Sequence, residues 1–361
     1  MNSKILERVE NIQAKLLNNR HSVFVIINDE DSNWENLYYM SGFRGTSGAL
    51  LIYSDHVELI LDSRYTEQGK MQSPHDVLEQ KSGLVDAVIE RLVNHNIKEI
   101  YCEAKRTSAS IWLKLLSSKR EIQDASEQIE ALRRKKDEYE IRCIIKAGQI
   151  ASTAFLETLN HVKEGMSEKE LQSLLNYKIA TLGGEIGFDM IVASGIRSAL
   201  PHGRASEKTI QKNEWVTVDF GARWNGYFCD ITRNFSIGVP DERATFYHSI
   251  LLEAHRASAA LLQNNASGSE VHNKAVEVLA AHNLDAYFTH GLGHGLGLEI
   301  HESPYLRKSI NDILRTGDVV TIEPGIYIEG WGGLRLEDDY LITEKGSQRL
   351  TDQLNQQFYL L

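Results

Sequence analysis

Residues 214–233 read EWVTVDFGARWNGYFCDITR, a pattern typical of two short β-strands joined by a tight turn. Asn225 and Gly226 lie at its centre. An Asn-Gly pair favours a two-residue hairpin turn, because both turn positions require a positive φ. With this turn, Trp224 lies opposite Tyr227, and the rest of the strand pairing follows by counting outward.

Two aspartates of this predicted hairpin share one face. The register places Asp219 opposite Thr232, and Asp230 lies two residues before Thr232. Diagonal neighbours of this kind are about 7–8 Å apart at Cα, so their side chains can reach a common point. Two carboxylates there repel each other unless a cation lies between them. We hypothesise that metal ions do, and the alternative is a solvated hairpin face with two surface carboxylates.

The composition is that of a globular protein with two domains. The chain has 361 residues, more than one typical domain contains. Hydrophobic residues make up 42% and charged residues 25%, and the net charge is −11. This charge argues against a general surface for nucleic acid or anionic membranes. The scattered Cys102, Cys143 and Cys229 favour reduced structural thiols over a disulfide framework.

The sequence shows no pattern of export or membrane insertion. Residues 1–20 mix charged and apolar side chains, which predicts an amphipathic helix and not the apolar segment of a signal peptide. No apolar run approaches the 18 or so residues that span a bilayer. We therefore expect a cytoplasmic protein without a membrane anchor.

The first third of the chain has the pattern of an α/β domain, which we place at residues 1–124. A glycine-rich loop at residues 41–48 (SGFRGTSG) lacks the Lys-Ser ending of a phosphate-binding loop, so we do not interpret it as a nucleotide site. The expected elements are helices at 5–17 and 84–93, strands at 22–28 and 97–102, and a hairpin formed by 49–53 and 56–61.

A charged segment follows, and we place the domain boundary there, so that the second domain covers residues 128–361. Ser167 and Glu170 form a capping box that starts one of its helices. Helices are expected at 137–159, from 167 to the glycines at 183 and 184, at 241–263 and at 269–282, and strands at 319–322, 326–328 and 334–343. We expect His272 to face outward from its helix.

Residues 290–302 read HGLGHGLGLEIHE and contain three histidines within twelve residues. Glycine at every second position is a poor helix and a poor strand, but it lets the backbone and ligands approach one point closely. The spacing superficially resembles a nucleotide-binding glycine loop, which would leave the histidines unexplained. We therefore consider His290, His294 and His301 as metal ligands or acid–base groups, with structural histidines as the alternative.

Two glutamates lie on strands with apolar neighbours. Glu323 follows the buried-looking segment 319–322, and Glu337 lies among leucines. By the period of two, Arg335 and Glu337 point the same way along one strand. A carboxylate at such a position is a surface residue by default, but on a buried strand it needs a partner.

The candidate ligands form an oxygen-rich set without sulfur. Such a set suits Mn²⁺, Co²⁺ or Zn²⁺ better than Cu⁺ or an iron–sulfur cluster. It contains more carboxylates than one divalent ion needs, and two ions about 3.5 Å apart would share bridging carboxylates. The predicted ligands are Asp219, Asp230, His294, Glu323 and Glu337.

The stretches DFG…CDITR, THGLGHGLG, EPGIY and RLED, in this order, resemble the ligand motifs of the pita-bread metallopeptidases. This family includes methionine aminopeptidases, aminopeptidase P, prolidases and the metal-free creatinase. The resemblance implies a pita-bread α+β catalytic domain at 128–361. It also implies that residues 1–124 are the N-terminal domain of the prolidase and creatinase branch, a domain that the simplest methionine aminopeptidases lack.

The resemblance also implies a role for each ligand. Asp219 would chelate one metal ion, and Asp230 and Glu337 would bridge both. His294 and Glu323 would bind the other ion, and Glu323 would also move the proton of the nucleophilic water. Every ligand position holds the expected residue type, so the loss of ligands seen in creatinase is not found here.

Further residues match the substrate side of the family's site. His202 matches the substrate-side histidine, and His290 and His301 match histidines that contact the substrate and the developing oxyanion. Arg335 matches an arginine near the substrate or the metal ligands. The resemblance further implies two ions, with Mn²⁺ as the first choice, and a homodimer formed through the N-terminal domain.

From these motifs we expect a metallopeptidase that hydrolyses the bond before proline, as an Xaa-Pro dipeptidase (prolidase) does. The tertiary amide before proline lacks an N–H, so ordinary backbone-reading proteases handle it badly. Aminopeptidase P, which acts on longer Xaa-Pro peptides, is the alternative. A metal-free creatinase-like hydrolase and a non-catalytic peptide-binding module are further alternatives.

Overall fold

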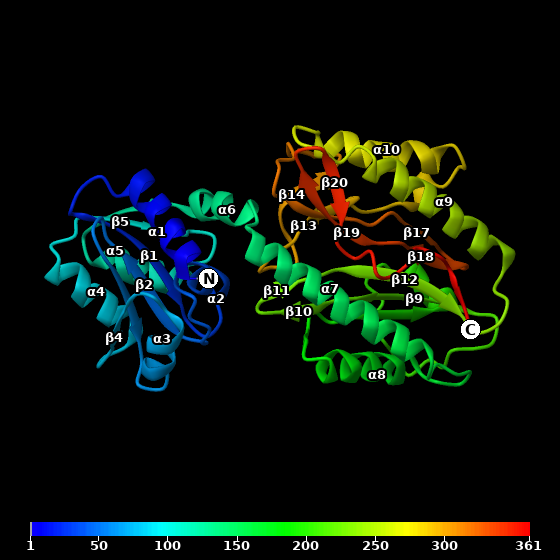
Figure 1. Cartoon of the computed structure of the whole chain (residues 1–361), viewed down its shortest axis with the longest axis horizontal. Coiled ribbons are helices and arrows are strands. Elements are labelled where there is room, and N and C mark those ends of the chain that lie inside the picture. Colours follow the sequence, from blue (N-terminus) through cyan, green and yellow to red (C-terminus); the bar gives the residue numbers. More distant parts are fainter. Residues whose placement is uncertain (1) are drawn as a thin grey trace. The chain divides into compact units, whose positions relative to one another are not determined.

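The chain divides into two compact units between Arg133 and Arg134 in the computed structural model, which describes residues 2–361 (Figure 1). The division lies inside α6 (Ser126–Arg134), later in the chain than the boundary expected between residues 124 and 128. That the two units are separate domains with the expected limits stays a prediction. No helix within residues 2–361 is long and apolar enough to cross a membrane.

Unit 1 is built on a six-stranded sheet in the order β4-β3-β2-β1-β5-β6. Its central strand, β1, is buried at all seven positions, which explains why SVFVIIN shows no alternation of polar and apolar residues. Its strands are β1 (Ser22–Asn28), β2 (Gly48–Ile52), β3 (Val57–Leu61), β4 (Asp76–Glu79), β5 (Glu99–Cys102) and β6 (Glu121–Asp124). Its helices are α1 (Asn2–Leu16), α2 (Trp34–Ser41), α3 (Thr66–Gln72), α4 (Leu84–Asn94) and α5 (Ala109–Ser117). The α/β architecture expected for the first third of the chain is confirmed.

Unit 2 contains four sheets and four α-helices among its described residues. The helices are α7 (Glu138–Leu159), α8 (Glu168–Thr181), α9 (Glu242–Ala259) and α10 (Gly268–Ala280), with 3-10 turns η1 (Gly195–Ala199) and η2 (Asp285–Tyr287). The strands of the first two sheets are β7 (Glu185–Ile186), β8 (Ile191–Ser194), β9 (Trp215–Phe220), β10 (Ala222–Trp224), β11 (Tyr227–Phe228), β12 (Ile231–Ser236) and β21 (Tyr359–Leu360). The others are β13 (Gly293–Gly295), β14 (Glu302–Arg307), β15 (Ile310–Asn311), β16 (Val319–Ile322), β17 (Gly325–Ile328), β18 (Gly332–Arg335), β19 (Asp338–Thr343) and β20 (Gly346–Arg349).

Each helix pair of unit 2 covers its own sheet. Apolar residues of α7 and α8 pack with β8, β9 and β12 in one core. Residues of α9 and α10 pack with β16 and β19 in a second core. Figure 1 shows the two helix pairs on opposite sides of the strands of unit 2. The strands between them are therefore buried, and charged side chains on these strands need partners inside the protein.

The helix starts follow from local hydrogen bonds. At α8, the backbone N–H of Glu170 donates to Ser167 Oγ (3.1 Å), and the backbone N–H of Ser167 donates to Glu170 Oε2 (2.7 Å). This is the capping box expected from the sequence, and such a cap contributes about 1 kcal/mol. Asp137 and Glu140 form a second capping box at the start of α7.

The predicted hairpin has the register obtained by counting outward from its turn. Trp224 pairs with Tyr227, and Asp219 pairs with Thr232 in the antiparallel β9–β12 ladder. Gly221 lies between β9 and β10, where an added Cβ would stand 2.2 Å from the carbonyl oxygen of Cys229. Only glycine permits this approach, so the hairpin continues past the break without losing its register.

Two expectations were wrong, one about the extent of a strand and one about the direction of a side chain. The strand expected at 334–343 is interrupted, because β18 pairs with β17 while β19 pairs with β16 in a different sheet. Glu337 therefore lies between two strands and not within one, but it lines the same cavity as Arg335, so the two side chains do point the same way. His272 is 7% exposed, and its ring lies 5.5 Å from that of Phe288, so it does not face outward.

Candidate metal centre

Five acidic or histidine side chains from separate elements line one cavity of about 550 Å³ in unit 2. They come from β9, the residue before β12, β13, the residue after β16 and the break between β18 and β19. They are Asp219, Asp230, His294, Glu323 and Glu337, the set expected from the sequence. The sheet pairings bring these positions together over more than 100 residues of chain, as the bridge between Thr232 and Glu337 illustrates.

The ligand atoms of this set converge around His294. Its Nε2 atom lies 3.7 Å from Asp230 Oδ2 and 3.5 Å from Glu323 Oε1. One ligand atom each from Asp230, His294 and Glu337 lie within 4.8 Å of one another. Asp219 is held near them by Arg335, whose Nη2 donates to Asp219 Oδ2 at 2.6 Å.

Burial and mutual repulsion disfavour the charged form of several carboxylates in this cluster. Burial, together with the charge of Glu337, raises the pKa of Asp230 well above its ordinary value. Burial likewise raises the pKa of Glu337, with Glu323 and Asp219 adding to the rise. The pKa of Glu323 is raised to about 8 by burial, and that of His294 is lowered to about 3. The cluster thus needs positive charge that the surrounding side chains do not supply in full.

The free oxygens of the cluster fit divalent cations. Asp219 Oδ1 and Asp230 Oδ1 are buried and have no hydrogen-bond partner among residues 2–361. A buried carboxylate oxygen without a partner is costly, and a metal ion would satisfy both. Four carboxylates and one imidazole form a hard donor set, which suits Mn²⁺, Co²⁺ or Zn²⁺. The residues therefore fit a pair of divalent ions.

The glycines around His294 allow three strands to meet at the site. A Cβ on Gly293 would lie 2.0 Å from Thr321 O, and one on Gly295 would lie 2.4 Å from Ser303 O. Against our expectation that alternating glycines make a poor strand, residues Gly293–Gly295 form β13, which pairs with both β14 and β16. The absence of side chains is what lets β13 fit there.

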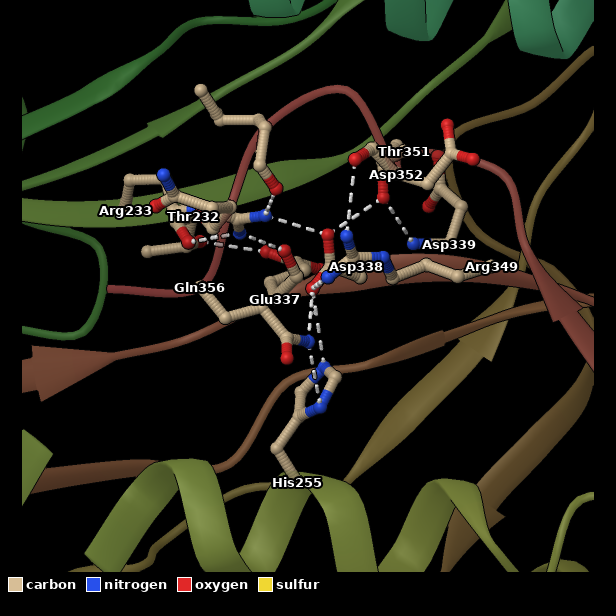
Figure 2. A network of polar contacts seen from close by, with 12 residues as sticks. Thr232, Arg233, His255, Glu337, Asp338, Asp339, Arg349, Thr351, Asp352 and Gln356 are labelled. Carbon is tan, nitrogen blue, oxygen red and sulfur yellow. Dashed lines mark hydrogen bonds and ion pairs between the residues drawn. The ribbon is translucent and has the colours of Figure 1, made fainter. Parts of the chain in front are cut away.

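A buried polar network holds the backbone next to two of the predicted ligands (Figure 2). Arg233 is fully buried and donates to Asp338 Oδ1 (2.6 Å) and to the backbone oxygen of Glu337 (2.6 Å). Asp339 Oδ2 accepts the backbone N–H of Asp230 at 3.0 Å. Thr351 also donates to Asp338 Oδ1. The network joins β12, β19 and the C-terminal segment, and it fixes the backbone at two of the predicted ligands, Asp230 and Glu337.

Sequence reasoning missed this network, although a signal was present. Asp338 directly follows the proposed ligand Glu337, and Arg233 lies shortly after Asp230 on a strand with apolar neighbours. A charged residue on a buried strand requires an opposite charge nearby. That rule, applied to Arg233, would have called for a buried acidic partner.

The remaining predicted residues lie on the same cavity. His202, His290, His301 and Arg335 all line it. Arg335 Nη1 donates to the hydroxyl of Tyr327 (2.6 Å), and this hydroxyl lies 3.0 Å from His290 Nε2. Burial lowers the pKa of His290 to about 4, so this imidazole is neutral near pH 7. Tyr327 lies in the EPGIY motif, but its link between Arg335 and His290 was not foreseen.

A second group of potential ligands lies in unit 1. Ligand atoms of His56, Glu58 and His95 lie within 4.8 Å of one another. However, Arg91 Nε donates to Glu58 Oε2 (2.9 Å), and Arg91 Nη2 lies 2.8 Å from His95 Nε2. Although burial works to raise it, the pKa of Glu58 is lowered, because Arg91 donates hydrogen bonds to it. The guanidinium of Arg91 already neutralises the charge of Glu58, so we assign no metal to this group.

The fold and the site define a two-unit metallopeptidase with a pita-bread catalytic part. A model of "Metallopeptidase family M24" matches residues 142–344, and a model of "Creatinase/Prolidase N-terminal domain" matches residues 8–135. The chain belongs to the metallopeptidase family M24. The resemblance stated from the four motifs is therefore confirmed, and the family implies a dinuclear metal site.

Named relatives belong to the branch that acts on Xaa-Pro peptides. The chain is 36% identical over 319 residues to an Xaa-Pro dipeptidase of Pyrococcus horikoshii. The match covers 88% of this chain and 90% of the relative. The structure of an X-Pro aminopeptidase from Thermotoga maritima matches with a TM-score of 0.92 and 36% identity, covering 97% and 99% of the two chains. An Xaa-Pro dipeptidase from Bacillus anthracis matches with a TM-score of 0.92 and 32% identity, covering 99% and 100%.

Proposed function

We propose that this protein is a dinuclear metallopeptidase that hydrolyses the peptide bond before proline, with Xaa-Pro dipeptides as its substrates. The observation that carries the proposal is the convergence of five carboxylate and imidazole side chains in one cavity, where two buried carboxylate oxygens lack hydrogen-bond partners among residues 2–361. The names of the Xaa-Pro dipeptidases of Pyrococcus horikoshii and Bacillus anthracis support the choice of substrate.

The proposed metal ligands are Asp219, Asp230, His294, Glu323 and Glu337. Asp230 and Glu337 are the proposed bridging residues, and Mn²⁺ is the first choice of ion, with Co²⁺ or Zn²⁺ as alternatives. Bound divalent ions would supply Lewis-acid polarisation of the scissile carbonyl and a water of lowered pKa. The choice among these ions depends on affinity order and on metal availability in the cell.

The proposed acid–base residue is Glu323. Its carboxylate lies 3.5 Å from His294 Nε2 and 3.8 Å from His290 Nδ1, at the edge of the ligand cluster. Glu323 would accept a proton from the attacking water and return it to the proline nitrogen as the C–N bond breaks. The proton returned there makes the proline a neutral leaving amine.

The remaining proposed residues bind the substrate or hold other side chains of the site in place. His202, His290 and His301 would contact the peptide and the developing oxyanion. Arg335 would hold Asp219 and Tyr327 in place, since it donates to both. Phe188, Ile191 and Tyr305 give the cavity apolar and aromatic walls that a proline ring can contact.

Turnover of Ala-Pro compared with Ala-Pro-Ala tests the proposal. We expect metal-dependent cleavage of Ala-Pro and slower cleavage of the tripeptide. Preference for the tripeptide would favour the second candidate, an aminopeptidase P, which the similarity to the Thermotoga maritima structure supports. No cleavage of either peptide would contradict both.

Two other candidate functions are less well supported. A metal-free creatinase-like hydrolase would keep its activity after exhaustive chelation, and a peptide-binding module would have no need for tightly held ions. The intact ligand set argues against both. A homodimer, a cytoplasmic location and the absence of nucleic-acid binding remain predictions from the sequence.

A further inference from the structure

The loop 195–206 carries His202 to the rim of the cavity. The imidazole of His202 is exposed and makes no hydrogen bond within the described part of the chain. Its position therefore depends on the backbone of the loop, because no hydrogen bond holds the ring itself. Whatever fixes the ends of this loop also determines where His202 meets a substrate.

Glu168 holds both ends of this loop. It is the first residue of α8, and its carboxylate is fully buried. Its Oε1 accepts from the backbone N–H of Ser194 (2.8 Å) and from the Ser194 hydroxyl (2.8 Å). Its Oε2 accepts from the backbone N–H of Ser206 (3.0 Å) and from the Ser206 hydroxyl (2.7 Å). One carboxylate thus joins the residue before the loop to the last residue of the loop.

We call Glu168 and its bonds to Ser194 and Ser206 the clamp. Arg197 adds to the clamp from within the loop. Its Nη1 donates to Glu168 Oε2, and its Nη2 donates to the backbone oxygen of Arg204 at 2.9 Å. The guanidinium therefore compensates the buried charge of Glu168 and braces the segment that follows His202. At the far side of the loop, Arg335 Nη1 lies 3.4 Å from the backbone oxygen of Pro201.

The start of α8 alone does not explain a buried glutamate at position 168. Ser167 and Glu170 already cap this helix, and Glu170 does so from the protein surface. A glutamate in the first turn already stabilises a helix when it is solvated, so burial is not required for this effect. The cost of burying the Glu168 carboxylate is offset by its bonds to the loop, so the loop is where it acts.

We propose that Glu168 is a positioning residue that places His202 for the reaction by fixing the two ends of the loop 195–206. The proposal rests on the proposed function, because His202 is assigned to the substrate there. Glu168 itself touches neither the cavity nor the proposed metal ligands. Glu168 therefore affects the reaction only by fixing the loop that carries His202.

The test is a double-mutant cycle of Glu168→Gln with His202→Ala, measured as kcat and KM for Ala-Pro. The amide introduced by Glu168→Gln presents an N–H₂ group to donors that need an acceptor, so one end of the loop is released. We expect Glu168→Gln to lower kcat/KM about 10- to 100-fold in the wild-type background, as small displacements of reacting groups do. In the His202→Ala background we expect a further loss below about 2-fold.

Glu170→Gln is the matched control, because it changes a carboxylate in the same helical turn but leaves the loop untouched. It should keep wild-type kcat/KM. If Glu168→Gln does not fold, Ser206→Ala removes a single hydroxyl from the clamp and should show a smaller loss with the same dependence on His202. An equal loss in both backgrounds would mean that Glu168 is merely structural, and would overturn the proposal.

Amide hydrogen exchange gives a readout that does not depend on activity. Residues 195–206 should exchange faster in Glu168→Gln than in the wild type or in Glu170→Gln. A wild-type protein that cleaves no Xaa-Pro peptide would contradict the proposed function. Unchanged exchange and unchanged kcat/KM in Glu168→Gln, with an active wild type, would contradict only the clamp.

Discussion

At the residue scale, the site depends on carboxylates whose charges are not balanced by neighbouring side chains. Asp219 illustrates this, since one oxygen accepts from Arg335 and the other is buried without a hydrogen-bond partner in the described chain. A neutral amide at this position would keep the shape of the side chain and lose the charge that a cation needs.

We therefore expect Asp219→Asn to lower kcat/KM for Ala-Pro by at least about 100-fold while the protein remains folded. Near-UV circular dichroism checks the fold, and elemental analysis should show less bound metal than in the wild type. Asp285→Asn, at an exposed aspartate of η2, is the control and should behave as the wild type. Wild-type turnover by Asp219→Asn would remove this residue from the metal site.

Glu103 in unit 1 makes stability depend on pH. Burial raises its pKa from 4.5 to about 7, although Asn33 Nδ2 donates to its carboxylate at 2.8 Å. The folded state therefore binds the proton more tightly than the unfolded state does. The resulting stability is fully present below about pH 4.5 and is lost as the pH rises through about 7.

Replacement of Glu103 by glutamine tests this, because glutamine resembles the protonated acid at every pH. As the pH rises from 4.5 to 8, the wild type should lose up to about 3 kcal/mol of unfolding free energy relative to Glu103→Gln. Urea unfolding of both proteins across this range measures it. Glu121→Gln, at an exposed position of β6, should show no such trend, and a parallel pH dependence of wild type and Glu103→Gln would disprove the assignment.

At the element scale, the Arg233–Asp338 ion pair joins β12 to β19. Both side chains are fully buried, and they are linked by a 2.6 Å contact. Without Arg233, the buried Asp338 carboxylate keeps only longer contacts to basic side chains, to Arg349 (3.6 Å) and His255 (3.5 Å), and losing one partner of a buried pair costs about 3–5 kcal/mol. Replacing both with apolar residues removes the buried charge, although the backbone oxygen of Glu337 then loses the donor that Arg233 provides.

We expect Arg233→Met to destabilise the protein by about 3–5 kcal/mol and the double variant Arg233→Met/Asp338→Leu to recover part of this loss. Urea unfolding of the two single variants and the double variant measures the coupling. Lys274→Met, which breaks an exposed pair with Glu277, should change the free energy by less than about 0.5 kcal/mol. Additive losses in the double variant would show that the two residues act independently.

At the scale of the whole molecule, metal binding and folding are linked. A ligand that binds only the folded state stabilises it by about 2.7 kcal/mol at 100 times its Kd. Since the cluster in unit 2 holds buried carboxylates with raised pKa values, divalent ions should add more stability than they would at a surface site.

Removal of divalent ions should therefore abolish cleavage of Ala-Pro and lower the Tm, and added Mn²⁺ should restore both. Scanning calorimetry with and without chelator measures the shift, and Mg²⁺ at equal ionic strength controls for screening. The Tm shift should be reduced in Asp219→Asn. A Tm and a turnover that do not respond to chelation would support the metal-free hydrolase instead.

The sequence alone determined the local features and the family, and it supplied the proposed ligands. The Asn225–Gly226 turn set the hairpin register that pairs Asp219 with Thr232, because turn geometry depends on two adjacent residues. Ser167 and Glu170 marked the start of α8 for the same reason. Four short motifs, recognised together, identified the family and pointed to the five proposed ligands, which all line the cavity.

Only the tertiary structure decided which residues support those ligands. The break before Glu337, the burial of His272 and the partners of Arg233 depend on sheet pairings and packing that no local pattern encodes. The clamp at Glu168 likewise joins residues 26 and 38 positions away. Local sequence governs contacts within a few residues, whereas the balance of buried charge is settled where distant segments meet.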